Sequence, residues 1–211
     1  MADLSKLHDA ILTGDSKTAV AVTKEALAEN ADPMELVTKY MVPAMDEVGR
    51  RFECEEYFVP ELLLAARAMK GSLELIRPLL VERGAEPAGR VVIGTVKGDL
   101  HDIGKNLVAS MLEGGGFEVI DLGTDVAPDK FVQAVKDRNA NIVCLSALLT
   151  VTMPSMKTTI EALRTAGVRD QVKVMVGGAP VTQQYASDIG ADGYGDNANE
   201  AVRLARALVA T

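Results

Sequence analysis

The chain has few of the residues that build disulfide or zinc scaffolds. Only two of its 211 residues are cysteines, Cys54 and Cys144, and they stand far apart in the sequence. Two isolated cysteines make neither a disulfide framework nor a zinc knuckle. Histidine is equally scarce, with only His8 and His101. A zinc site needs three or four protein ligands, and His101 has no second histidine or paired cysteine nearby, so the sequence disfavours zinc.

The chain also has no excess of positive charge and no long apolar run. Its formal net charge is -8 at pH 7, which argues against nucleic acid or an anionic membrane as the main partner. No apolar run approaches the roughly 20 residues that a membrane span needs. The first six residues lack the basic-then-apolar layout of a signal peptide. We therefore expect a cytoplasmic protein without a membrane segment.

Helical spacing is the only pattern before about residue 83, which predicts a helical domain over residues 1–84. Asp32 and Pro33 look like an N-cap followed by proline at the first helical position. Pro43 should kink its helix, Pro60 opens the next, and Pro78 requires a bent or frayed last turn. Four short antiparallel helices would form a bundle. The predicted apolar faces are Leu4, Leu7 and Ile11; Val20, Thr23 and Leu27; Val37, Tyr40, Ala44 and Val48; and Leu62, Ala66, Met69, Leu73, Ile76 and Leu80.

Beyond a glycine- and proline-containing linker at residues 84–89, strands alternate with helices. This alternation predicts an α/β domain over residues 90–211, with a parallel sheet and right-handed crossovers. A five-stranded, flavodoxin-like (Rossmann-like) sheet of order 2-1-3-4-5 is the obvious candidate. The predicted strands are 91–96, 117–122, 142–145, 172–176 and 192–194, and the predicted helices are 103–114, 128–139, 153–166, 180–189 and 197–209.

A loop between the first of these strands and its helix carries the run GDLHDIGKN at residues 98–106. His101 therefore lies at the carboxyl end of a strand, where open α/β sheets bind their ligands. Asp99, two residues earlier, is close enough to orient the imidazole and raise its basicity. Without other signals, His101 would be a loop-stabilising residue and Asp99 a turn former.

Two further motifs change this interpretation. Ser146-x-Leu148 and Gly177-Gly178 also follow predicted strands, and with Asp99-x-His101-x-x-Gly104 they resemble the cobalamin-binding signature DxHxxG…SxL…GG. Nearly the whole chain resembles the corrinoid proteins of three-component methyltransferase systems. These are similar to the cobalamin-binding module of methionine synthase.

The resemblance implies a role for each motif residue around the lower face of cobalamin. His101 would replace the cofactor's own dimethylbenzimidazole as the axial ligand of cobalt. Asp99 would hydrogen-bond His101, and a hydroxyl, here matched by Thr152, would complete the relay, although relatives often carry serine there. Gly104 would clear space for the macrocycle and nucleotide tail. The cofactor-binding stretch also includes Asp102 and Ile103.

The remaining motif residues would enclose the displaced benzimidazole. The resemblance places the Ser146 and Thr150 hydroxyls against it, with Leu148 packed on its ring. Gly177 and Gly178 would open the slot for the nucleotide tail, although alone they are a common strand-end turn.

The helical half carries a second point of resemblance, the pattern F-x-x-x-x-Y-F-x-P-E at residues 52–61. In the family this pattern caps the upper face of methylcobalamin. Phe58 would then cover the cobalt-bound methyl group, with Leu62 nearby on the same helix. The alternative is that both residues pack the start of a helix in the bundle core.

The implied activity is methyl carriage, by a corrinoid subunit rather than a stand-alone enzyme. One substrate-specific corrinoid methyltransferase would deliver a methyl group to Co(I), giving methyl-Co(III). A second methyltransferase would pass it to tetrahydrofolate or a thiol coenzyme, and a reductive activase would restore Co(I). Neither the methyl donor nor the acceptor can be predicted from the sequence.

Three alternatives remain open. The small subunit of a cobalamin-dependent mutase shares DxHxxG but lacks a helical cap. A cobalamin-dependent sensor module would normally be fused to an output domain. A flavodoxin-like domain that binds flavin or carries a phosphoryl group would leave His101, Ser146 and the double glycine unexplained together.

Overall fold

The computed structural model describes residues 2–84 and 86–210, which divide into two compact units. The first unit holds the residues up to Pro87 together with Glu113–Gly116, and the second holds Ala88–Leu112 and the chain from Phe117 onward. No helix among the described residues has the length and apolar character required to span a membrane.

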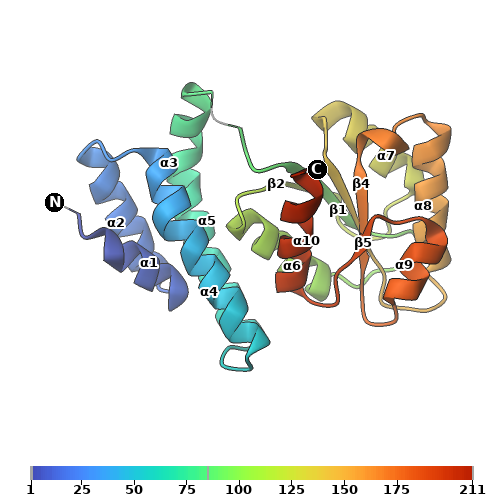
Figure 1. Cartoon of the computed structure of the whole chain (residues 1–211), viewed down its shortest axis with the longest axis horizontal. Coiled ribbons are helices and arrows are strands. Elements are labelled where there is room, and N and C mark those ends of the chain that lie inside the picture. Colours follow the sequence, from blue (N-terminus) through green and yellow to red (C-terminus); the bar gives the residue numbers. More distant parts are fainter. Residues whose placement is uncertain (1, 85, 211) are drawn as a thin grey trace. The chain divides into compact units, whose positions relative to one another are not determined.

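The first unit is helical (Figure 1). Its elements are α1 (Leu4–Leu12), α2 (Ser16–Ala28), α3 (Pro33–Glu35), the π-helical segment η1 (Leu36–Met41), α4 (Val42–Glu53) and α5 (Val59–Glu82). Since α3, η1 and α4 follow one another without a break, the described chain forms four helical segments in this unit. Their core contains the fully buried side chains Leu7, Ile11, Leu36, Met41, Leu62, Met69 and Ile76.

The predicted face of the second helix is partly wrong. Val20 and Leu27 are only half-buried, whereas Ala19, Val22 and Ala26 are buried beside Thr23. Helix α2 packs on α5, and this packing buries a face turned away from the predicted one. A Cβ atom at Gly71 of α5 would lie 3.0 Å from the Val20 side chain. The absence of a side chain at Gly71 thus lets Val20 approach α5, although Val20 stays half-buried.

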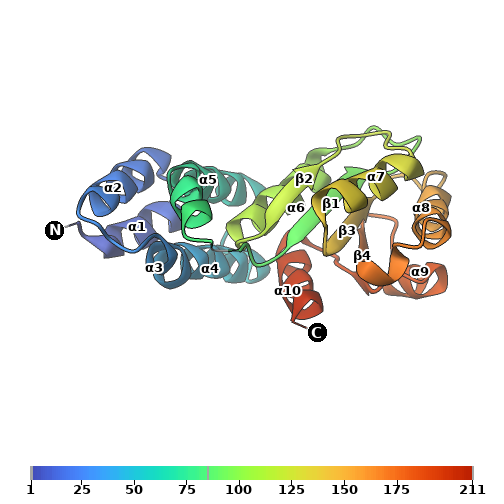
Figure 2. The same cartoon turned by 90° about the horizontal axis from the view of Figure 1, so that it is seen from above.

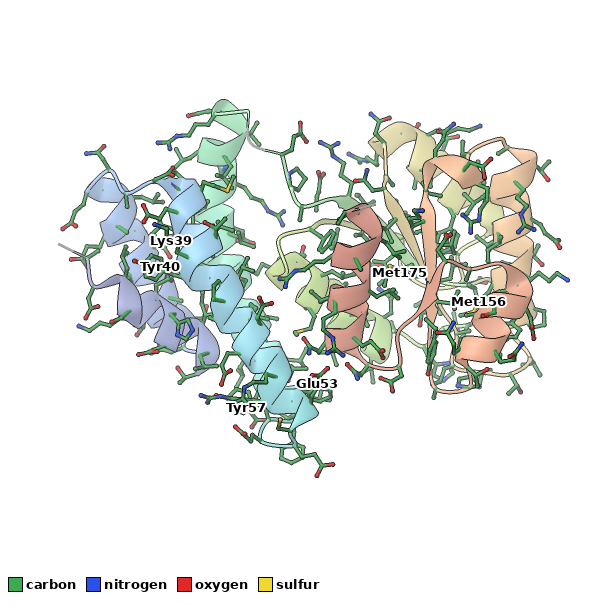
Figure 3. The ribbon with its side chains drawn as sticks, viewed as in Figure 1. Lys39, Tyr40, Glu53, Tyr57, Met156 and Met175 are labelled. Carbon is green, nitrogen blue, oxygen red and sulfur yellow. The ribbon has the colours of Figure 1, made fainter. Side chains whose placement is uncertain are left out.

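Pro43 does not break its helix, because the turn before it is wider than an α-turn. The Val42 amide donates to the Val37 carbonyl, five residues back, and Pro43 occupies the first turn of α4. A proline in an α-helix clashes with the carbonyl four residues earlier, and a π-turn removes that clash. Lys39 and Tyr40 lie on this segment (Figure 3). Helix α5 continues past Pro78 to Glu82.

The second unit contains a parallel sheet of order β2-β1-β3-β4-β5, which confirms the predicted fold class (Figure 2). Each element lies within a few residues of its prediction. Helix α9 starts later than expected because Val181 closes a turn on Gly178 and Thr182 caps the helix. The elements are β1 (Arg90–Thr95), α6 (Ile103–Gly114), β2 (Glu118–Asp121), α7 (Pro128–Arg138), β3 (Ile142–Ser146), α8 (Pro154–Thr165), the 3-10 turn η2 (Arg169–Gln171), β4 (Lys173–Gly177), α9 (Gln183–Ile189), β5 (Gly193–Tyr194) and α10 (Ala198–Val209).

Helices cover both faces of this sheet, with α6 and α10 on one face and α7, α8 and α9 on the other (Figure 1). The core under α7 and α8 contains Val92, Phe131, Val143, Met156 and Ile160. Strand register sets the position of the motifs, because Thr95 pairs with Ser146 and Ser146 pairs with Gly177. The three motifs therefore meet at the carboxyl-terminal edge of the sheet, where β1, β3 and β4 end.

Candidate functional site

The buried carboxylate of Asp99 is the centre of this edge. The side chain is fully buried, and its Oδ1 accepts hydrogen bonds from the His101 amide at 3.0 Å and from His101 Nδ1 at 2.7 Å. Its Oδ2 accepts from the Leu148 amide at 2.8 Å, the Leu149 amide at 3.3 Å and Thr152 Oγ1 at 2.7 Å. Asp99 thus joins the loop after β1 to the loop after β3.

The surroundings of Asp99 keep it ionised. Burial alone would raise the pKa of this carboxyl, but the hydrogen bonds from His101, Thr152 and Leu148 outweigh burial and lower its pKa well below the usual range. An ionised carboxylate only accepts hydrogen bonds, so Nδ1 of His101 carries the hydrogen that points to Asp99. In the neutral imidazole the lone pair is then on Nε2. The His101 side chain is 50% exposed, so it is not shut off from a ligand, and Nε2 is the nitrogen that would bind a metal.

The structure places Thr152 beside Asp99 and buries it. Its hydroxyl lies 2.7 Å from Asp99 Oδ2 and 2.8 Å from the Leu149 carbonyl oxygen. A hydroxyl has one hydrogen, which is therefore shared between two acceptors. The methyl group that distinguishes threonine from serine lies next to Gly98, at ordinary van der Waals distance from the place of a Cβ atom there.

The physical reason for a glycine differs among the motif positions. A Cβ atom at Gly178 would lie 1.9 Å from the Ala147 carbonyl oxygen, and the residue has φ +128°. The protein backbone itself therefore requires glycine there. At Gly177 a Cβ atom would lie 3.1 Å from the Gly195 carbonyl oxygen. At Gly104 a Cβ atom would meet nothing within 4 Å. No described protein group requires a glycine at Gly104, whereas close approach of a ligand would.

Two predicted cofactor-binding hydroxyls stand at the end of β3. Ser146 is half-buried and Thr150 is exposed. No group within residues 2–84 and 86–210 forms a hydrogen bond with either hydroxyl. They are free to bond a ligand at this edge of the sheet.

Exposed apolar side chains are present on the two loops that Asp99 joins, which is unusual for residues of their type. They are Leu100, Ile103, Leu148, Leu149 and Val151, with Leu100 73% and Val151 80% exposed. Of these, Leu100, Leu149 and Val151 were not predicted as site residues. The sequence feature that could have identified them is an apolar residue type within a loop that follows a strand. Asp102 is also exposed. These exposed apolar side chains suit a broad, partly apolar ligand.

The two predicted cap residues belong to the helical unit. Phe58 precedes α5 and is 61% exposed, and its amide donates to the Glu61 carboxylate at 2.9 Å. Leu62 is fully buried. Phe58 can offer its ring to a ligand, whereas Leu62 offers no surface in this structure. A contact between Leu62 and a cofactor stays a prediction.

Comparison with known proteins decides the family. Family models described as B12 binding domains match residues 89–203 and residues 4–77. The chain is 48% identical to trimethylamine corrinoid protein 2 of Methanosarcina mazei, over 98% of this chain and 95% of that protein. It is 44% identical to the dimethylamine corrinoid protein of Methanosarcina barkeri, over 98% and 97%.

The chain belongs to the B12-binding corrinoid proteins of methyltransferase systems. A solved methanol:cobalamin methyltransferase complex from Methanosarcina barkeri has the same fold, with a TM-score of 0.87 at 29% identity. That match covers 98% of this chain and 79% of the other. The predicted family and cobalamin cofactor are therefore confirmed.

The residues at the sheet edge fit that cofactor. His101 presents one nitrogen, which suffices for a metal whose other ligands come from a macrocycle. Gly104 leaves open space, and the Ser146 and Thr150 hydroxyls have no hydrogen-bond partner in the part of the chain that the structure describes. These residues would hold cobalamin through an axial nitrogen and leave room for its nucleotide tail.

Proposed function

We propose that this corrinoid protein carries methyl groups on a cobalamin that His101 Nε2 ligates. The observation that supports this proposal most directly is the bond between Asp99 Oδ1 and His101 Nδ1, which occupies Nδ1 and leaves Nε2 of a half-exposed side chain for the metal. When bound, the corrinoid supplies a cobalt centre that accepts a methyl group from one enzyme and yields it to another.

The chain's own residues would orient the ligand imidazole and strengthen its donation to the metal. Asp99 holds the imidazole ring in one plane and makes it a better electron donor. Thr152 and the amides of Leu148 and Leu149 stabilise the Asp99 charge. Ser146 and Thr150 would donate to the displaced benzimidazole, and Gly104 would let the tail approach the backbone.

A substrate-specific methyltransferase is the first partner, since corrinoid proteins work with such enzymes. The trimethylamine and dimethylamine relatives support a methylamine as the methyl donor. The second partner would be an acceptor methyltransferase that uses tetrahydrofolate or a thiol coenzyme. A reductive activase would maintain the reduced cobalt.

The test begins with protein that has been incubated with hydroxocobalamin and then desalted. We expect about one cobalt per chain, and a visible spectrum that changes in His101→Ala but not in His8→Ala. The loaded protein is then reduced anaerobically to Co(I) with a strong chemical reductant and mixed with purified methylamine or methanol methyltransferases and isotope-labelled donors. Label on the protein with a methylamine enzyme supports the proposal. Label only with the methanol enzyme would overturn the donor class, and no retained cobalt would overturn the whole proposal.

A further inference from the structure

A buried threonine holds the loop that carries the cobalt ligand. Thr95, the last residue of β1, is fully buried. Its amide donates to the Gly123 carbonyl at 2.9 Å, and its carbonyl accepts from the Val126 amide at 3.0 Å. Its hydroxyl is therefore the group left for another contact. That hydroxyl donates to the backbone carbonyl of His101 at 2.8 Å.

Asp125, in the loop between β2 and α7, holds the same segment from a second direction. Its Oδ1 accepts from the Gly98 amide at 2.8 Å, and its own amide donates to the Asp99 carbonyl at 2.9 Å. Lys97 forms an ion pair with the same carboxylate at 3.1 Å. Asp125 has φ +52°, a left-handed conformation that asparagine and aspartate tolerate better than other side chains.

These contacts lie on both sides of Asp99 along the chain. Asp125 holds the backbone at Gly98 and Asp99, and Thr95 holds it at His101. The bond between Asp99 Oδ1 and His101 Nδ1 spans only two residues, so its geometry depends on the backbone between them. A loop free at either end would populate arrangements in which Nε2 points elsewhere.

We propose that Thr95 and Asp125 are positioning residues, which act through the backbone to present His101 to cobalt. This inference rests on the proposed function, because it assumes that His101 is the ligand. Neither residue needs to touch the cofactor. Loss of one hydrogen bond at the loop should weaken cobalt ligation by about fivefold, the effect of one net hydrogen bond.

The chain offers matched variants for each residue. Thr95→Val removes the hydroxyl but keeps the branched shape, and Thr95→Ser keeps the hydroxyl. Asp125→Ala removes the acceptor for the Gly98 amide, and Asp125→Asn keeps an acceptor and tolerates the positive φ. Thr23→Val is the control in the helical unit, since buried Thr23 also donates to one carbonyl, that of Ala19, at 2.8 Å.

Two measurements read the position of the loop. In the hydroxocobalamin-loaded protein, a cyanide titration followed by visible spectroscopy gives the cyanide concentration that displaces the imidazole. In the protein without cofactor, hydrogen exchange gives the protection of the His101 and Gly98 amides. We expect about fivefold lower cyanide midpoints and reduced protection in Thr95→Val and Asp125→Ala. Thr95→Ser, Asp125→Asn and Thr23→Val should match the wild type in both.

The outcomes separate this inference from the function beneath it. If His101→Ala lowers the cyanide midpoint while Thr95→Val and Asp125→Ala do not, the positioning role is wrong and the ligand assignment stands. A lower melting temperature with an unchanged cyanide midpoint would likewise reduce both residues to structural roles. If His101→Ala leaves the midpoint unchanged, the ligand assignment fails and this inference fails with it.

Discussion

At the scale of single residues, buried hydroxyls differ in whether they have a hydrogen-bond partner. Thr23 donates to the Ala19 carbonyl, whereas the buried Ser72 hydroxyl has no partner within the described residues. A buried polar group without a partner costs about 1–3 kcal/mol, and a paired one contributes about 1 kcal/mol. These two residues of the helical unit therefore have opposite effects on stability.

Replacement of each hydroxyl tests this difference. Ser72→Ala should raise the free energy of unfolding by about 1 kcal/mol, and Thr23→Val should lower it by about 1 kcal/mol. Urea denaturation measures both. Equal losses in the two variants would mean that Ser72 is paired in solution.

The two thiols also differ at this scale. Cys144 lies in β3, and burial raises the pKa of its thiol to about 12, whereas Cys54 is exposed. Since the thiolate is the reactive form, a disulfide reagent at pH 8 should modify Cys54 quickly and Cys144 only on unfolding. Cys54→Ser should abolish the fast reaction, and Cys144→Ser should retain it. Two fast thiols in the wild type would contradict the burial of Cys144.

At the scale of elements, the start of α6 and the end of β4 both carry glycine for different reasons. Gly178 is required by the nearby Ala147 carbonyl and by its own φ of +128°. Gly104 opens onto free space. Gly178 therefore serves the fold, and we propose that Gly104 serves the ligand.

Alanine at each position separates these roles. Gly178→Ala should lower the free energy of unfolding by about 3 kcal/mol, because both strain and a backbone clash follow. Gly104→Ala should leave unfolding nearly unchanged but weaken binding of hydroxocobalamin. Denaturation and a binding titration measure the two effects. A destabilised Gly104→Ala variant with unchanged binding would contradict the account.

The element pattern explains what could be predicted from the sequence. Strands and helices of the α/β unit followed from apolar runs and helical spacing, and the parallel order then placed the motifs at one edge. Local sequence was sufficient because each motif directly follows its own strand. Asp99 and His101 are only two residues apart, so their contact was also predictable.

Features that depend on packing could not be predicted. The buried face of α2 depends on its packing against α5, and the π-turn before Pro43 depends on the whole helical segment. The contacts of Thr95 and Asp125 with the ligand loop join distant residues through side-chain direction. Burial of Leu62 and exposure of Val151 are likewise tertiary properties that spacing does not determine.

At the scale of the whole molecule, cofactor binding couples to folding. A ligand that binds only the folded chain stabilises it by about 2.7 kcal/mol at a free concentration of 100 times its Kd. Hydroxocobalamin should therefore raise the thermal midpoint of the wild type and of His8→Ala. His101→Ala should show a smaller rise at the same concentration, because it loses the axial bond. Differential scanning fluorimetry or calorimetry measures these shifts, and equal rises in all three would contradict ligation by His101.

The most direct test of the central claim is the nitrogen that binds cobalt. The protein is produced with ¹⁵N-labelled histidine, loaded with unlabelled cobalamin and reduced to Co(II) for electron paramagnetic resonance. Because ¹⁴N splits each cobalt line into a triplet and ¹⁵N into a doublet, the account predicts doublets in the labelled protein and in labelled His8→Gln. Triplets that persist in the labelled protein would show that the benzimidazole remains the ligand, and would contradict the role of His101.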